Sequence, residues 1–334
     1  SLSKISSTRY SNKSFNNKFG VPISLSEIKK KNQFGVFEIG MDKKGEISKL
    51  TKLVRPDVGI ITNISYAHIK NFKSLSEIAT AKSELIDEIN NNGKVILNKD
   101  DKFFNYFKKK ALKKNLKIIS FGIKTNADIK FISLKKNIFS FKKNKKIYKL
   151  KIDPNLSSYI DNLLATIAVI TLYFEIEHIN KNIFSKFNPP KGRGDKFLKK
   201  INSKVINIID ESYNSNPLSL KFSIKKFNDL RVRGKKIVLL GDMLELGKFS
   251  KILHLNMSKI INKSNIDKVY VYGRYIRHTF DKIKTKKKGT ILKNIKDIKN
   301  LLKTLQNGDY LMIKGSNSTG LNSLIKDFRK NNAL

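Results

Sequence analysis

The chain has 334 residues, 40% of them hydrophobic and including 21 Phe and 11 Tyr, so it can build two ordinary domains with substantial cores. It contains no cysteine, which excludes disulfides, thiolate metal sites and a cysteine nucleophile and fits a cytoplasmic location. The longest uncharged apolar run, residues 162–174, is too short to span a bilayer, so we expect a buried helix there and no membrane span.

The formal net charge of +42 suggests a polyanion partner. However, 8 of the 69 basic residues are arginine, whereas proteins that read nucleic acids favour the bidentate arginine fork. The lysines are spread through every segment together with many Asn, Ile and Phe, a composition that A/T-rich codons produce. We therefore expect no specific nucleic-acid partner, and a non-enzymatic basic nucleic-acid-binding protein is the less favoured alternative.

The first half of the sequence begins with two predicted strands that end in polar residues. Residues 34–39 predict a buried strand that contains Glu38 near its end, and residues 58–62 predict a strand that leads through Asn63 to His68. A carboxylate at a strand end suits a hard cation such as Mg²⁺. Considered individually, Glu38 is more simply interpreted as a capping or ion-paired residue, and His68 as an exposed loop residue.

Helix signals follow each of these strands. Residues 45–54 predict a helix that Arg55-Pro56 ends, and Ser74-Leu75-Ser76-Glu77 is a capping box whose helix carries Lys82 to about residue 89. The later predicted elements are strands 95–97 and 118–121 around a helix near 101–114, an antiparallel meander from 127 to 152, a buried helix near 159–175, and a shorter helix before Pro189-Pro190.

The segment Pro-Pro-Lys-Gly-Arg-Gly at 189–194 is the best candidate linker, and it divides the chain into domains 1–190 and 191–334. Strands and helices alternate beyond it, which predicts a doubly wound α/β domain. The predicted strands fall near 204–210, 236–241, 268–272 and 310–314, and the predicted helices near 217–229, 249–263, 274–284, 293–305 and 319–330.

Polar residues follow three of these strands. Asp210-Glu211 opens a run that ends in Asn216-Pro217, which caps and starts a helix. Gly241–Gly247 and Lys314-Gly315-Ser316 follow two other strands. Because the carboxyl ends of parallel strands share one edge of a sheet, we expect these groups to converge on a site for ribose hydroxyls or phosphate.

Taken together, the ordered motifs resemble the Mur ligase family, and within it the branch with Tyr-Asn-Ser-Asn-Pro at 213–217. The resemblance covers nearly the whole chain, which makes it far more specific than a lone glycine-rich match. The matching stretches are Phe15-Asn16-Asn17 with Gly20-Val21-Pro22, Glu38-Ile39-Gly40 with Gly45-Glu46-Ile47, Arg55-Pro56-Asp57, Asn63-Ile64 with Ala67-His68, Ala81-Lys82-Ser83-Glu84, Asn162, Gly192-Arg193, Asp210–Pro217, Gly241–Gly247 with His254, and Lys314-Gly315-Ser316.

The resemblance implies an α/β fold in which a P-loop-type central ATPase domain is followed by a Rossmann-like C-terminal domain. It also implies an ATP- and Mg²⁺-dependent ligase of peptidoglycan precursor synthesis, and so a part in cell wall biogenesis, cell shape and cell division. The substrates would be UDP-N-acetylmuramoyl-tripeptide and D-alanyl-D-alanine, and the protein a monomer. The peptide carboxylate would attack the γ-phosphate of ATP, and the dipeptide amine would then displace phosphate from the acyl phosphate.

Residue roles carry over to the matching positions. Glu38, His68 and Lys82 would be Mg²⁺ ligands, and His68 and Lys82 the catalytic residues, Lys82 after carbamylation into a carboxylate-like group. The ATP contacts would be Asn162, Arg193 and Glu211. The substrate contacts would be Asn16, Asn17, Asn214, Asn216 and Lys314.

The chain departs from the family pattern at Glu211, usually Asp, at Ser158, often His, and at Asn317, often Arg. The family also has a phosphate-binding loop ending in Gly-Lys-Thr, which the resemblance places upstream of residue 1, and no G-x-x-x-x-G-K-[ST] pattern occurs in the sequence. We therefore expect an N-terminally truncated ATPase domain and no catalysis by residues 1–334 alone. A ligase of the folylpolyglutamate synthase type is the first alternative, and the run Asp210–Pro217 argues against it.

Overall fold

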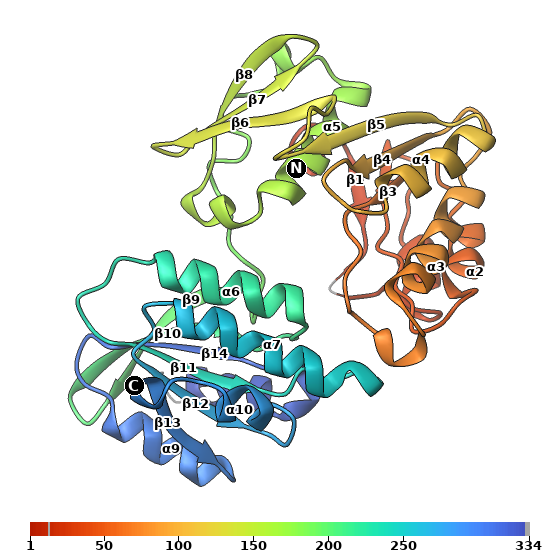
Figure 1. The fold of residues 1–334 in the computed structure, drawn as a ribbon. Helices are drawn as coiled ribbons and strands as arrows, with labels where there is room; N and C mark the ends of the chain where they lie inside the picture. Colours follow the sequence, from red (N-terminus) through yellow and green to blue (C-terminus); the bar gives the residue numbers. More distant parts are fainter. Residues whose placement is uncertain (13, 331–334) are drawn as a thin grey trace. The chain divides into compact units, whose positions relative to one another are not determined.

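The computed structural model describes residues 1–12 and 14–330, which form two compact units of the predicted α/β class (Figure 1). The first unit combines Ser1–Ile64 with Asn71–Phe187, and the second combines Ser65–Lys70 with the described chain from Asn188 onward. Among the described residues, no helix has both the length and the apolar character that crossing a membrane requires.

The first unit is built on a six-stranded sheet in the order β3-β4-β5-β6-β7-β8. Its strands from β3 to β6 run parallel, and β6, β7 and β8 form the predicted antiparallel meander. The strands are β3 (Val58–Ile61), β4 (Lys94–Asn98), β5 (Lys117–Gly122), β6 (Ile129–Lys135), β7 (Ile138–Lys143) and β8 (Lys146–Lys151). The helices are α1 (Gly20–Ser26), α2 (Glu46–Val54), α3 (Leu75–Asp87), α4 (Phe104–Lys113) and α5 (Ile160–Tyr173).

Helix α5 packs on β4, β5 and β6, and its almost wholly apolar sequence places it in the main core of this unit, as the sequence predicts. Helix α3 is capped by Ser74, whose Oγ accepts the N–H of Glu77 at 3.2 Å. The Glu77 carboxylate accepts the N–H of Lys73 at 2.7 Å, so the reciprocal bond of the predicted capping box comes one residue earlier than expected.

The prediction of a buried strand at 34–39 is wrong. The strand is β2 (Phe34–Val36), which pairs in parallel with β1 (Thr8–Tyr10) in a separate two-stranded sheet. Such a small sheet cannot cover both faces of its strands, and the Val36 side chain is 43% exposed. Glu38, two residues beyond the strand, is exposed too.

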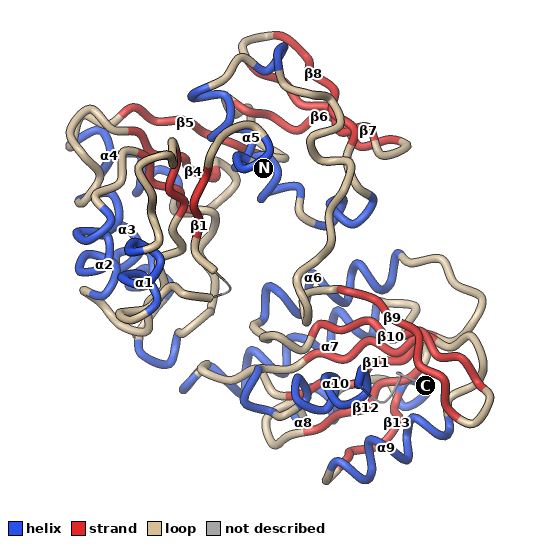
Figure 2. Tube along the Cα trace, turned by 180° about the vertical axis from the view of Figure 1, so that it is seen from behind, coloured by secondary structure: helices blue, strands red, loops and turns tan. Residues whose placement is uncertain are grey.

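The second unit is built on a six-stranded sheet in the order β13-β12-β11-β14-β10-β9, seen from behind in Figure 2. All its pairings are parallel except that of β9 with β10. The strands are β9 (Asp195–Ile201), β10 (Lys204–Glu211), β11 (Lys236–Gly241), β12 (Lys268–Tyr272), β13 (Lys288–Leu292) and β14 (Tyr310–Lys314). The helices are α6 (Pro217–Asp229), α7 (Ser250–Lys263), α8 (Arg277–Asp281), α9 (Ile295–Thr304) and α10 (Leu321–Lys330).

The sequence prediction missed both edge strands of this sheet, β9 and β13. Lysines interrupt the apolar pattern of β9, and β13 contains only two apolar residues, Ile291 and Leu292. Edge strands are commonly charged, since lysine there discourages pairing with another chain. The shorter helix predicted before Pro189-Pro190 is reduced to a 3-10 turn, Ile176–His178.

A buried histidine fastens the loop that follows β11. His254 on α7 is inaccessible to solvent, and its Nε2 accepts the N–H of Met243 at 3.1 Å. Its Nδ1 lies 2.8 Å from the carbonyl oxygen of Ser250 and donates to it. Burial is the main reason that the pKa of His254 is lowered below 6.5; nearby His278 lowers it further, whereas Asp242 opposes the shift.

The core of the meander offers a direct test of packing. Phe139 on β7 is fully buried, so Phe139→Ala should lower the free energy of unfolding by about 3–5 kcal/mol in a urea titration. Ile147 on β8 is 58% exposed, and Ile147→Ala should cost about 1 kcal/mol or less. Equal losses for the two variants would contradict the core assigned to this unit.

The His254 arrangement predicts a pH dependence of stability. Because the pKa of His254 in the folded protein lies below 6.5, His254 takes up a proton in the unfolded chain first as the pH falls. The free energy of unfolding therefore decreases as the pH falls below about 6.5. Removing the titrating group in His254→Gln should therefore flatten the fall in unfolding free energy between about pH 7 and pH 5. The matched control is His178→Gln, at an exposed histidine, which should leave the slope as in the parent protein.

Candidate functional site

Three neighbouring strands of the second sheet end in the polar residues that the sequence analysis expects to converge. Strand β14 lies between β10 and β11, with Lys314 in register with Glu211 on one side and Leu240 on the other. Ser316 connects the strand ends: its N–H donates to the carbonyl oxygen of Asp242 at 2.9 Å, and its Oγ accepts the N–H of Leu244 at 2.8 Å. The predicted convergence is confirmed.

Lys314 is a buried cation at the centre of this edge. Its Nζ donates to the carbonyl oxygen of Asn214 at 2.9 Å and lies 3.7 Å from the Glu211 carboxylate. Burial lowers the pKa of Lys314, and Glu211 opposes that shift. Burial likewise lowers the pKa of Lys226 on α6, again against the attraction of Glu211. Sequence reasoning missed Lys226, because one more lysine on a helix carries no signal in this chain.

The exposed side chain of Arg193 stands on a tightly held loop. Gly192 and Gly194 flank it, both with positive φ, and a Cβ at Gly192 would lie 2.9 Å from atoms of Tyr213. The N–H of Tyr213 donates to the carbonyl oxygen of Gly192 at 3.0 Å, and the N–H of Gly194 to that of Asp210 at 2.7 Å. The guanidinium of Arg193 lies over the Tyr213 ring, 4.2 Å from its centroid.

Asn214 and Asn216 have local structural partners. The Asn216 side chain accepts the N–H of Ser219 at 2.9 Å and Ser219 Oγ accepts the N–H of Asn216, a capping box that starts α6 where the sequence predicts it. The exposed Asn214 accepts the N–H of Ser215 through Oδ1 at 2.7 Å. The two side chains thus shape the loop between β10 and α6.

In the first unit, two expected site residues contact each other. Asn16 Nδ2 donates to a carboxylate oxygen of Glu38 at 2.8 Å, and the Asn16 carbonyl accepts the N–H of Gly40 at 2.7 Å. Asn17 Oδ1 accepts the N–H groups of Phe19 and Gly20, so this side chain helps start α1. Expected substrate residues and the expected carboxylate ligand therefore share one loop cluster.

Lys82 on α3 lies at the carboxyl end of β3. Its Nζ donates to the carbonyl oxygen of Asn63 at 3.1 Å, and burial lowers its pKa despite the opposing charge of Asp101. Asp101 accepts the N–H of Ile64 at 2.8 Å and so connects the ends of β3 and β4. Asp101 was not predicted as a site residue, although Asp100-Asp101 follows β4 and so lies at a strand end like the predicted residues. Asn162 is exposed in the first turn of α5.

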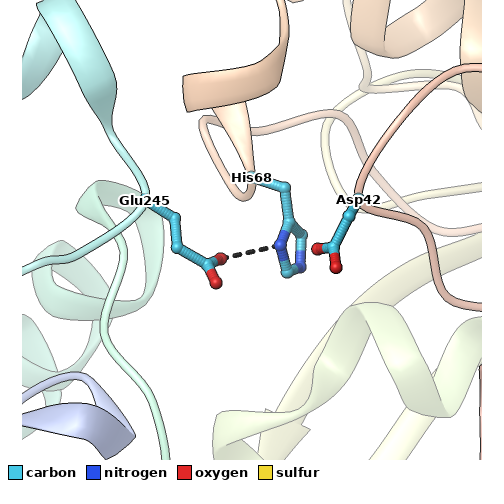
Figure 3. Close-up of side chains that lie close together, drawn as sticks. All are labelled: Asp42, His68 and Glu245. Atoms are coloured by element: carbon cyan, nitrogen blue, oxygen red, sulfur yellow. Dashed lines mark ion pairs between the residues drawn. The ribbon is translucent and has the colours of Figure 1, made fainter.

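His68 belongs by its contacts to the second unit, whereas Glu38 and Lys82 belong to the first. Its Nδ1 lies 2.7 Å from a carboxylate oxygen of Glu245 (Figure 3). Both residues have left-handed backbones, with φ of 58° and 62°, and the N–H of Lys70 donates to the Glu245 carbonyl at 2.9 Å. Glu245 lies in Gly241–Gly247 but was not predicted as a partner of His68.

Known proteins are similar to this chain over both of its units. A UDP-N-acetylmuramoyl-tripeptide–D-alanyl-D-alanine ligase from Rickettsia prowazekii (strain Madrid E) is 29% identical over 319 residues, which cover 93% of this chain and 70% of that protein. The crystal structure of MurF from Acinetobacter baumannii superposes with a TM-score of 0.83 at 26% identity, covering 98% of this chain and 72% of that one. A bifunctional folylpolyglutamate synthase/dihydrofolate synthase shares the fold more distantly, with a TM-score of 0.62 and 12% identity.

Two family models match in the same order as the two units. The model described as Mur ligase middle domain matches residues 2–170, and the model described as Mur ligase, glutamate ligase domain, matches residues 197–317. Together with the strand-end motifs, these matches show that the chain belongs to the Mur ligase family.

Proposed function

We propose that the protein carrying this chain is an ATP-dependent amide ligase that joins D-alanyl-D-alanine to UDP-N-acetylmuramoyl-tripeptide in peptidoglycan precursor synthesis. Residues 1–190 would act as the ATP-binding central domain and residues 191–334 as the C-terminal domain. The observation that carries the proposal is the junction of Lys314 and Ser316 with the Tyr213–Pro217 loop, the run that marks this branch of the family. The name of the Rickettsia relative supports the same substrates.

The residues of the second unit suit negatively charged reactants. An acyl phosphate and a nucleotide both bring negative charge, and Arg193 exposes a guanidinium beside the strand end that carries Glu211. Glu211 would accept ribose hydroxyls, and Arg193 would contact the phosphate side of ATP. Lys314, Asn214 and Asn216 would face the incoming dipeptide, and Asn16 and Asn17 the muramoyl peptide. In the first unit, Asn162 would contact adenine.

Mg²⁺ would neutralise phosphate charge when bound, and the residues in the first unit fit it in a specific way. Glu38 offers an exposed carboxylate oxygen, the ligand type that Mg²⁺ prefers. An ammonium group cannot ligate a cation, but burial lowers the pKa of Lys82 and so favours the neutral amine. A neutral amine can add CO₂, form an N–C bond and release a proton, and the carbamate then supplies oxygen. By the family resemblance the third ligand would be His68, which belongs by its contacts to the second unit.

The choice of acceptor amine tests the proposal. The protein expressed from its complete reading frame should form an amide with D-alanyl-D-alanine, with ADP and phosphate released in equal amounts, and no product with L-glutamate. Mass spectrometry of the product and a phosphate assay measure both. Product with glutamate alone would identify a ligase of the folylpolyglutamate type instead. Tight, salt-resistant RNA binding without any ligation would favour the nucleic-acid-binding alternative.

The Lys82 assignment predicts a carbamate that can be observed without an activity assay. In ¹³C-bicarbonate, the protein should show a carbamate carbon signal by NMR, and Lys82→Arg should remove it. Lys82→Ala and His68→Ala should each lower turnover by about 10- to 100-fold or more, the usual cost of disturbing a metal site. Lys73→Ala changes an exposed lysine just before α3 and should change neither readout. An unchanged NMR signal in Lys82→Arg would remove Lys82 from the metal site.

A further inference from the structure

Three charged side chains meet where β9 begins and β10 ends. Arg329, on the last helix α10, donates through one NH₂ group to the carboxylate of Asp195 and, at 3.2 Å, to that of Asp210. Its guanidinium lies over the Phe197 ring, 4.1 Å from the centroid. The motifs that place the chain in its family do not include Arg329, Asp195 or Phe197.

The two aspartates also hold the loop that carries Arg193, Asp195 through its carboxylate and Asp210 through its backbone carbonyl. Asp195 Oδ1 accepts the N–H of Gly192 at 2.7 Å, and the backbone carbonyl of Asp210 accepts the N–H of Gly194 at 2.7 Å. Asp210 Oδ1 accepts both the N–H and the hydroxyl of Ser212, which fixes the turn after β10. The loop on either side of Arg193 is thus attached to the two residues that Arg329 contacts.

The two carboxylates need a shared cation. The side chains of Asp210 and Asp195 are 5% and 14% exposed, so water screens their repulsion poorly. Burial, with a further contribution from Asp210, raises the pKa of Asp195, and Arg329 opposes the rise. A planar guanidinium can serve two carboxylates at once, whereas a lysine ammonium is a single point charge.

We propose that Arg329 is a positioning residue for nucleotide binding, which acts by neutralising Asp195 and Asp210 and so holding the 192–194 loop with Arg193 in its binding conformation. This inference rests on the proposed function, since it takes Arg193 as a nucleotide contact. Without the guanidinium, the two carboxylates repel each other, and Asp195 moves away with the loop that it holds. Arg329 itself does not touch the nucleotide.

The test compares ADP affinity, measured by calorimetry with Mg²⁺ present, across variants of the protein expressed from its complete reading frame. Arg329→Met should weaken ADP binding by about tenfold or more, and Arg329→Lys by less, because it keeps one charge. Adding Asp195→Asn to Arg329→Met should restore part of the affinity, since the amide removes the repulsion and its oxygen still accepts the Gly192 N–H. Lys326→Met, at an exposed lysine on the same helix, should bind ADP like the parent.

Steady-state kinetics distinguish a specific loss of nucleotide binding from general destabilisation, which would affect both substrates. The KM for ATP should rise in Arg329→Met, while the KM for D-alanyl-D-alanine stays within about twofold of the parent value. Affinity for ADP within twofold of the parent in Arg329→Met would overturn the inference and leave the proposed function standing. If that variant does not fold, unchanged ADP affinity in a folded Arg329→Lys protein would overturn it equally. A parent protein that binds no adenine nucleotide would overturn both.

Discussion

A charged side chain that is buried away from water must be paired within the protein. This constraint determines how side chains are arranged at the carboxyl edge of the sheet in the second unit. Lys314 is buried because the carbonyl of Asn214 and the carboxylate of Glu211 receive its ammonium. Arg329 links Asp195 and Asp210 in the same way. These contacts join β14, β10, β9 and α10 through polar groups, so the geometry of the strand ends depends on charges being matched as well as on apolar packing.

The same constraint explains how the fold accommodates so many lysines. Lys236 and Lys287 are buried. Lys236 donates through Nζ to the carbonyl oxygen of Asn228 in the last turn of α6, and Lys287 donates to those of Ser264 and Ile266 between α7 and β12. Burial lowers the pKa of both side chains, the expected sign when solvation is lost. Several lysines are therefore structural donors, which weakens the argument from net charge to a polyanion partner.

Sequence reasoning succeeded where local rules and the fold agree. The capping residues Ser74 and Asn216 start the helices they were expected to start, and the ends of β10, β11 and β14 converge because parallel strands of one sheet must end at one edge. It failed for the strand near Glu38, since an apolar run does not reveal how many neighbours a strand will have. The role of Arg329 was equally hidden, because its carboxylate partners lie more than a hundred residues away along the chain.

His68 shows a further limit of reasoning from chain order. It follows β3 closely, which suggests that it works with the groups at the end of that strand, such as Asn63 and Lys82. Yet segment 65–70 belongs to the second unit: His68 lies beside Glu245 in the loop after β11, and the Tyr66 ring lies 6.1 Å from that of Phe249. Left-handed backbones at both His68 and Glu245 carry a cost for residues other than glycine, so they persist where surrounding contacts hold them. The position of a residue in the sequence therefore shows which strand it follows. Its side-chain contacts with charged groups and aromatic rings decide to which unit it belongs.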